Sequence, residues 1–140
     1  MADPVRVGII GLNANSGQAG RSHMPAIDAL PTLTLAGVAN RNAENSKEAA
    51  AKFGGTAFDS VDAMVNSPDI DLVVISTPVP VHHELVMQAI NGGKHVLSEW
   101  PFGATLAEAV EMRDAAKAKN LVTAMGLQGR GTPDLNQVRD

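Results

Sequence analysis

The chain of 140 residues has the size of one domain, and its 44% hydrophobic and 19% charged residues suit a packed core rather than a disordered segment. A net charge of −4, three Phe, one Trp and no Tyr argue against a nucleic-acid partner, and the lack of cysteine excludes disulfides and thiolate chemistry. The chain start lacks a signal-peptide pattern and no apolar run reaches the roughly 20 residues of a membrane helix, so we expect a cytoplasmic protein without a membrane partner.

The first half of the chain predicts strands that alternate with helices. Val5–Ile10 is a continuous apolar run that stops at Gly11, which is typical of a strand covered on both faces. Residues 17–30 predict a helix in which Pro25 marks either a kink or the true first turn. The other elements expected in this half are strands at 33–39 and 56–58 and helices at 43–53 and 60–65.

The second half continues this alternation. Residues 72–75 are the clearest buried strand, and Thr105 with Glu108 forms a capping-box pattern at the start of a helix over 105–119. The other elements expected here are a helix at 81–90 and strands at 95–97 and 121–125.

Six strands separated by short helical crossovers predict an α/β fold. Parallel strands need such crossovers, and the crossovers are right-handed, so we expect a doubly wound parallel sheet (Rossmann fold) of strand order 3-2-1-4-5-6. We expect this domain to span residues 1–131, followed at 132–140 by a polar tail or the truncated start of a helix, with the second domain absent.

The turn after the first strand is rich in glycine and asparagine. A strand, such a turn and a helix open a dinucleotide-binding domain, because backbone N–H groups in the turn and the helix N-terminus can face a pyrophosphate. The glycines stand at Gly11, Gly17 and Gly20, so the strict G-x-G-x-x-G spacing is missing and Asn13 takes the second position. Asparagine tolerates left-handed backbone angles and can partly replace glycine there. A plain strand-to-helix turn without a ligand is the alternative.

The end of the second strand bears on the choice of cofactor. NAD-binding domains usually place a carboxylate there for the ribose hydroxyls, whereas this chain has Asn40 and Arg41 and no carboxylate before Glu44. Arg41 can pair with a 2′-phosphate, which slightly favours NADP over NAD. The alternative is that Arg41 is a solvated residue at the start of a helix.

Two later segments carry further motifs. Residues 76–82 follow the fourth strand, and residues 93–101 contain the fifth strand and its exit. Together with the opening turn they resemble the Gfo/Idh/MocA family of oxidoreductases, which carries Thr-Pro-Asn-x-x-His and Gly-Lys-His-Val-x-x-Glu-Lys-Pro motifs. The chain departs from these motifs at Val79 and Trp100, where the family has Asn and Lys. Other positions are similar to the subgroup that contains a galactose-regulon repressor. These positions are residues 11–14, Gly17, His23, Glu99 with Trp100, and residues 127–130.

The resemblance implies a set of residues that bind the dinucleotide. It implies that the first glycine turn lines the pyrophosphate, that Thr77, Pro78 and His82 form the wall on the nicotinamide side, and that Glu99 contacts ribose hydroxyls with Trp100 beside the ring. The cofactor-binding residues expected in full are Gly11, Leu12, Asn13, Gly17, Asn40, Arg41, Ser76, Thr77, Pro78, Val79, His82, Glu99 and Trp100.

The resemblance also implies hydride transfer to or from a sugar or polyol-like substrate. An indole cannot replace the ammonium of the family's lysine, so we expect no catalytic residue in this chain and binding without efficient turnover. The alternative is a dinucleotide-sensing regulator without catalysis. Expected partners are a pyridine dinucleotide and either a second copy of the chain or a missing substrate domain.

His82 and His83 diverge on a helix, so no metal site is expected, and His23 is expected to pack or cap in the first helix.

Overall fold

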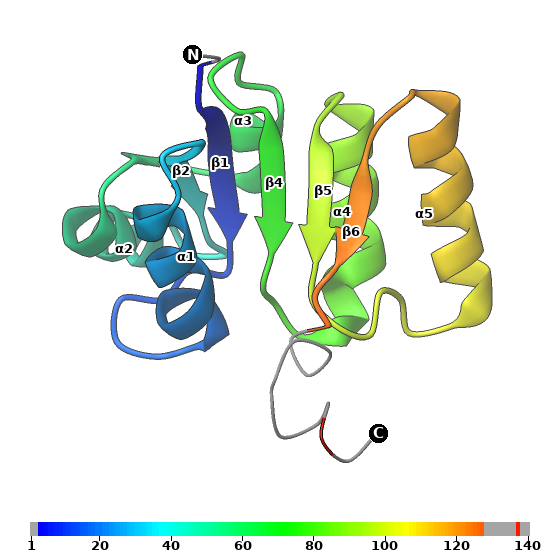
Figure 1. Ribbon diagram of the computed structural model, residues 1–140, viewed down its shortest axis with the longest axis horizontal. Helices are drawn as coiled ribbons and strands as arrows, with labels where there is room; N and C mark the ends of the chain where they lie inside the picture. Colours follow the sequence, from blue (N-terminus) through cyan, green and yellow to red (C-terminus); the bar gives the residue numbers. More distant parts are fainter. Residues whose placement is uncertain (1–2, 128–136, 138–140) are drawn as a thin grey trace.

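The computed structural model describes residues 3–127 and 137, and within them six strands form one parallel sheet (Figure 1). The strand order is β3-β2-β1-β4-β5-β6, and every neighbouring pair is parallel. The doubly wound α/β fold predicted from the sequence is therefore confirmed. The strands are β1 (Val5–Ile10), β2 (Leu33–Ala39), β3 (Thr56–Ala57), β4 (Leu72–Ile75), β5 (His95–Ser98) and β6 (Thr123–Met125).

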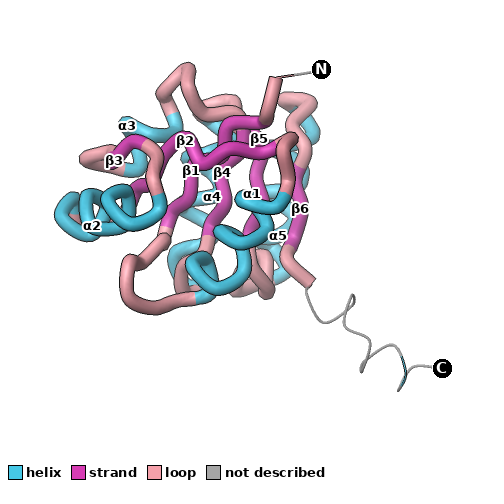
Figure 2. Tube along the Cα trace, turned by 60° about the vertical axis from the view of Figure 1, so that its left-hand side comes forward, coloured by secondary structure: helices cyan, strands magenta, loops and turns pink. Residues whose placement is uncertain are grey.

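Helices cover both faces of this sheet (Figure 1, Figure 2). On one face a buried cluster joins β1 and β4 to the helices η1, α1 and α2, and on the other a second cluster joins the sheet to α3, α4 and α5. The strand residues alternate between these clusters, as Val74 and Ile75 do, because successive side chains point to opposite faces. The helices are η1 (Ala19–His23), α1 (Met24–Ala29), α2 (Ala43–Phe53), α3 (Val61–Val65), η2 (Val79–Val81), α4 (His82–Asn91) and α5 (Leu106–Ala118).

The first helical segment begins later than predicted, at Ala19, because Gly17 has a φ of +101° that no helix contains. It starts as a π-helix and continues as α1, and Pro25 lies in the first turn of α1. Because proline lacks an N–H and cannot donate into the preceding turn, it stands where the π-helix gives way to the α-helix. Pro25 thus lies in the first turn of α1, but helical turns already precede it from Ala19.

The later helices agree with their sequence signals to within a residue or two. Thr105 is the N-cap of α5, with its hydroxyl 3.2 Å from the backbone N–H of Glu108, and the Glu108 carboxylate accepts from the N–H of Ala104 at 2.8 Å. The predicted capping pair is thus present. The helix predicted at 81–90 is α4, which is preceded by the short 3₁₀ turn η2.

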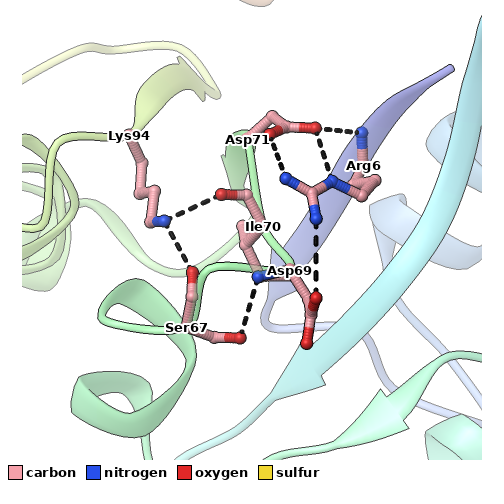
Figure 3. A network of polar contacts seen from close by, with 6 residues as sticks. All are labelled: Arg6, Ser67, Asp69, Ile70, Asp71 and Lys94. Atoms are coloured by element: carbon pink, nitrogen blue, oxygen red, sulfur yellow. Dashed lines mark hydrogen bonds and ion pairs between the residues drawn. The ribbon is translucent and has the colours of Figure 1, made fainter. Parts of the chain in front are cut away.

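A polar network closes the amino-terminal edge of the sheet (Figure 3). Arg6 of β1 donates through Nη2 and Nε to the two oxygens of Asp71, at 2.7 and 2.9 Å, and this pairing lowers the pKa of Asp71 to about 2. Lys94 donates to the carbonyls of Ser67 and Ile70, and burial lowers the pKa of its ammonium. The network joins β1, β4 and β5 at the edge opposite their carboxyl ends, so it supports the fold.

The boundary predicted near residue 131 and the tail predicted at 132–140 lie outside the described residues, apart from Gln137. The part of the subgroup resemblance on residues 128–130 lies outside them too. No helix in the described part of the chain is long and apolar enough to span a bilayer.

Candidate functional site

A groove of about 690 Å³ opens at the carboxyl edge of the sheet, where β1, β2 and β4 end and α4 begins. The strand order reverses between β1 and β4, which is where open α/β sheets bind ligands. The volume lies within the range of small-molecule sites. The groove is lined by Ile10, Gly11, Asn13, Asn40, Arg41, Asn45, Val61, Ser76, Thr77, Pro78, Pro80, Val81, Glu84, Leu85 and Gln88.

Gly11 lies in the lining of this groove, at a position where a side chain does not fit. Its φ is +90°, and a Cβ built on it would lie 2.3 Å from the carbonyl oxygen of Ser76 and 3.0 Å from Cγ2 of Thr77. The N–H of Ser76 donates to the carbonyl of Ile10 at 2.9 Å, so the ends of β1 and β4 are held at this spacing. A glycine here permits the tight turn out of β1 and the close approach of β4, and the tight turn is the role of the first glycine in a dinucleotide fold.

The loop after Gly11 is shaped by the side chain of Asn13. Its Oδ1 accepts from the N–H groups of Asn15 and Ser16, at 2.8 and 3.1 Å, in an Asx turn. The expectation that Asn13 takes a left-handed angle in place of glycine is wrong, since Asn120 is the one non-glycine residue with positive φ in the described part of the chain. Lys52 of α2 donates to the carbonyl of Ala14 at 2.5 Å and ties the loop to the domain.

The end of β2 forms the second wall of the groove. Asn40 donates through its side chain to the carbonyl of Leu12 at 2.9 Å, and its N–H donates to the hydroxyl of Ser46 at 2.9 Å. Asn40 therefore links the ends of β1 and β2. Arg41 beside it is exposed, and no hydrogen bond or ion pair of its side chain occurs among residues 3–127. A cation thus faces the groove.

Two of the predicted cofactor residues have buried side chains. Leu12 packs in the cluster beneath α1, and a ligand can reach only its backbone. His82 is fully buried, with Nε2 2.8 Å from the carbonyl oxygen of Thr77 and Nδ1 2.9 Å from that of Pro101. The hydroxyl of Thr77 is buried without a hydrogen-bond partner among the described residues. His82 lies behind the groove wall rather than on its surface.

Three further residues lie together near the exit of β5, outside the lining of the groove. Nε2 of His23, at the end of η1, is 2.5 Å from a carboxylate oxygen of Glu99, and each side chain is 15% exposed. Trp100 follows Glu99 and is 65% exposed. The alternative that His23 caps the first helix is wrong, because its side chain makes no cap bond and instead contacts a carboxylate 76 positions along the chain.

The groove thus brings together seven of the predicted cofactor residues: Gly11, Asn13, Asn40, Arg41, Ser76, Thr77 and Pro78. Gly17 and Val79 are not part of its lining. Sequence reasoning missed the contribution of η2 and α4, where Val81 of η2 lines the groove together with Glu84, Leu85 and Gln88 of α4. Their spacing of four residues on a helix that follows a ligand-facing strand was the available signal.

The groups that line the groove suit a pyridine dinucleotide. Gly11 gives a floor without a side chain, Arg41 supplies a cation for a phosphate, and Val61 with Leu85 gives an apolar surface for a base. No group of three His, Cys, Asp or Glu side chains that could hold a metal occurs among the described residues. His83 instead contacts Glu111 at 3.0 Å.

Comparisons with known proteins agree with this geometry. Residues 5–127 match the model of an oxidoreductase family with an NAD-binding Rossmann fold. A dTDP-3,4-didehydro-2,6-dideoxy-α-D-glucose 3-reductase of Actinomadura kijaniata is 30% identical over 139 residues, which are 99% of this chain and 41% of that protein. The galactose/lactose metabolism regulatory protein GAL80 of Saccharomyces cerevisiae is 30% identical over 149 residues, or 99% of this chain and 34% of that protein.

A solved structure gives the same result. A mutant of KijD10, a 3-ketoreductase from Actinomadura kijaniata solved with TDP-benzene and NADP, superposes with a TM-score of 0.90 at 29% identity. The match covers 99% of this chain and 43% of that one. The chain therefore spans less than half the length of these relatives.

Proposed function

The chain belongs to the Gfo/Idh/MocA family of oxidoreductases, and from this premise we propose that it binds NADP(H) ahead of NAD(H) in an enzyme acting on a sugar-like or polyol hydroxyl. The observation that carries the proposal is the bare backbone of Gly11 against Ser76, beside a groove with the exposed cation Arg41. The predicted family and the pyridine dinucleotide cofactor are confirmed by the matches above. The substrate and the preference for NADP are our proposals.

The groove takes the adenosine half of the cofactor in this proposal. The pyrophosphate lies over the loop from Gly11 to Gly17, where the start of η1 and backbone N–H groups other than those that bond Asn13 favour an anion. The adenine lies between Arg41 and α4, and the guanidinium of Arg41 pairs with the 2′-phosphate. Asn40 acts indirectly, because its bond to the carbonyl of Leu12 holds the loop in place.

The nicotinamide half extends past Thr77 and Pro78 toward Glu99 and Trp100. The bound cofactor supplies the hydride donor or acceptor, while the protein orients it. Trp100 offers its large exposed ring as a packing surface beside the nicotinamide. An indole N–H is a poor proton donor, so we propose that these residues bind the cofactor and that efficient turnover needs residues supplied by a substrate domain.

Thermal unfolding with each of the four cofactor forms tests cofactor binding. A ligand at about 100 times its Kd stabilises a native-only binder by about 2.7 kcal/mol, which raises the Tm by several degrees in a chain of this size. We expect the largest increase with NADPH. An unchanged Tm with NADPH, NADP⁺, NADH and NAD⁺ would overturn the proposal.

A dinucleotide-sensing regulator is the second candidate, and it is favoured by Trp100 in place of the family's lysine and by the similarity to GAL80. The two candidates predict different dehydrogenase activities for the variant Trp100→Lys, made in a protein that carries the substrate domain. Recovery of NADP⁺ reduction with an aldose or polyol would favour the enzyme. Continued lack of activity, with cofactor binding retained, would favour the regulator.

The surface of α5 and β6 supports a protein partner. Leu106 is 81% exposed, and together with Phe102, Val110 and Met125 it lines an apolar hollow of about 320 Å³. Contiguous exposed apolar surface marks an interface. We propose that a substrate domain or a second copy of the chain covers it, and a strictly monomeric chain at high concentration would leave the substrate domain as the partner.

A further inference from the structure

His82 joins two loops that the sequence does not place together. Its ring is the first side chain of α4, and it is fully buried between the loops that follow β4 and β5. Nε2 is 2.8 Å from the carbonyl oxygen of Thr77, and Nδ1 is 2.9 Å from that of Pro101. The hydroxyl of Ser98 lies 3.4 Å from Nδ1. One rigid ring thus spans both loops.

The two loops have different roles at the site. Thr77 lines the groove, whereas Pro101 directly follows Trp100 at the exit of β5. Glu99 is also tied to β4, because its N–H donates to the carbonyl of Ile75 at 3.2 Å. Through His82, a short and buried connection links Thr77 in the groove lining to the residue that follows Trp100.

We propose that His82 is a positioning residue that couples occupancy of the groove to the placement of Glu99 and Trp100, and this rests on the proposed function of the groove. A planar ring with nitrogens on two sides fixes the distance between the two carbonyls, because close-packed interiors transmit small shifts instead of absorbing them. The ring donates to one of these carbonyls and contacts the other, and the flexible side chain of glutamine cannot hold both contacts at these distances. The coupling is therefore specific to the imidazole.

The test uses a ligand that fills only the groove. Adenosine 2′,5′-bisphosphate carries the adenine and the 2′-phosphate but no nicotinamide, so it cannot stack on Trp100. Trp100 is the single tryptophan of the chain, and its fluorescence reports this loop alone. We expect a saturable change in Trp100 fluorescence when the bisphosphate binds, with a midpoint equal to the Kd measured by calorimetry.

His82→Gln should bind the bisphosphate within about tenfold of the original affinity but lose most of the fluorescence change. His83→Gln is the matched control, since His83 is the next residue and contacts Glu111 on the outer surface. It should keep the full response. An unchanged response in His82→Gln, or an equal loss in both variants, would overturn the coupling.

A measurement on the unaltered chain keeps the proposal testable if His82→Gln does not fold. Hydrogen exchange with and without the bisphosphate should show altered protection of the amides of Glu99 and Trp100. Calorimetric binding without any change at these amides would overturn the coupling while leaving the proposed function intact. A bisphosphate that does not bind at all would instead count against the proposed NADP site.

Discussion

Replacing Gly11 by alanine tests the close approach of β1 and β4 at the floor of the groove. The backbone angle of Gly11, φ +90°, costs an alanine about 1–2 kcal/mol. The new Cβ would also lie 2.3 Å from the carbonyl oxygen of Ser76, which cannot retreat without stretching the bond from its N–H to Ile10. Such overpacking adds about 1–3 kcal/mol. We therefore expect Gly11→Ala to lower the free energy of unfolding by about 2–5 kcal/mol.

Gly17→Ala separates the two contributions. Gly17 has a similar φ, +101°, but nothing lies within 4 Å of its Cβ position, so only the backbone cost of about 1–2 kcal/mol applies. Urea unfolding followed by circular dichroism measures both variants, with a slope of about 1–3 kcal/mol per molar urea for small proteins. Gly11→Ala should lower the midpoint clearly further than Gly17→Ala. Equal midpoints would show that the ends of β1 and β4 do not meet as described.

Three further predictions concern the groove, the amino edge and a helix cap. Arg41→Ser should weaken NADPH binding about 10–100-fold in calorimetry and leave the affinity for NADH unchanged, because it removes a charge-assisted bond to the 2′-phosphate. Arg113→Ser on α5 is the control. Equal losses of affinity for both cofactors would contradict the role of Arg41. Asp71→Asn should lower the free energy of unfolding by about 1 kcal/mol at pH 7, a value reduced for the partial exposure of the pair. Since the pKa of Asp71 falls from 3.8 to about 2 on folding, this difference should be complete above about pH 5 and disappear as the pH falls through 2 toward about 1. A constant difference would contradict the ion pair. Thr105→Ala should cost about 1 kcal/mol in urea unfolding through loss of the cap on α5, and Thr123→Ser, a change in β6 away from any cap, should cost less.

The elements of the fold could be predicted because their signals are local. Apolar runs such as Leu72–Ile75 and the cap at Thr105 depend on residues within a turn or two of each other, and the structure keeps both. The start of the first helical segment was less predictable. The positive φ of Gly17 and the π-helix after it follow a loop that is tied to α2, where Lys52 bonds the carbonyl of Ala14. No local pattern records that contact.

The site was predicted in outline and missed in its connections. Strand ends of a parallel sheet meet at one edge, so Gly11, Arg41 and Thr77 could be placed together from topology alone. The contact of His23 with Glu99 spans 76 positions and that of His82 with Pro101 spans 19. Both depend on side-chain directions after the sheet has formed. The sequence motif marks His82 as important, and only the three-dimensional arrangement shows that its side chain lies behind the groove wall.

The surroundings of Trp100 separate cofactor binding from proton transfer. Hydride transfer to a carbonyl leaves an oxygen that needs a proton, and a donor must lie within hydrogen-bond reach of that oxygen. At this end of the sheet the family's ammonium is replaced by an indole, His23 is held against Glu99, and His82 is enclosed between two carbonyls. In the proposed function, an enzyme built on this domain takes its proton donor from the substrate domain, whereas a sensor needs none. A donor in that domain within reach of the nicotinamide would therefore decide between the two proposed functions.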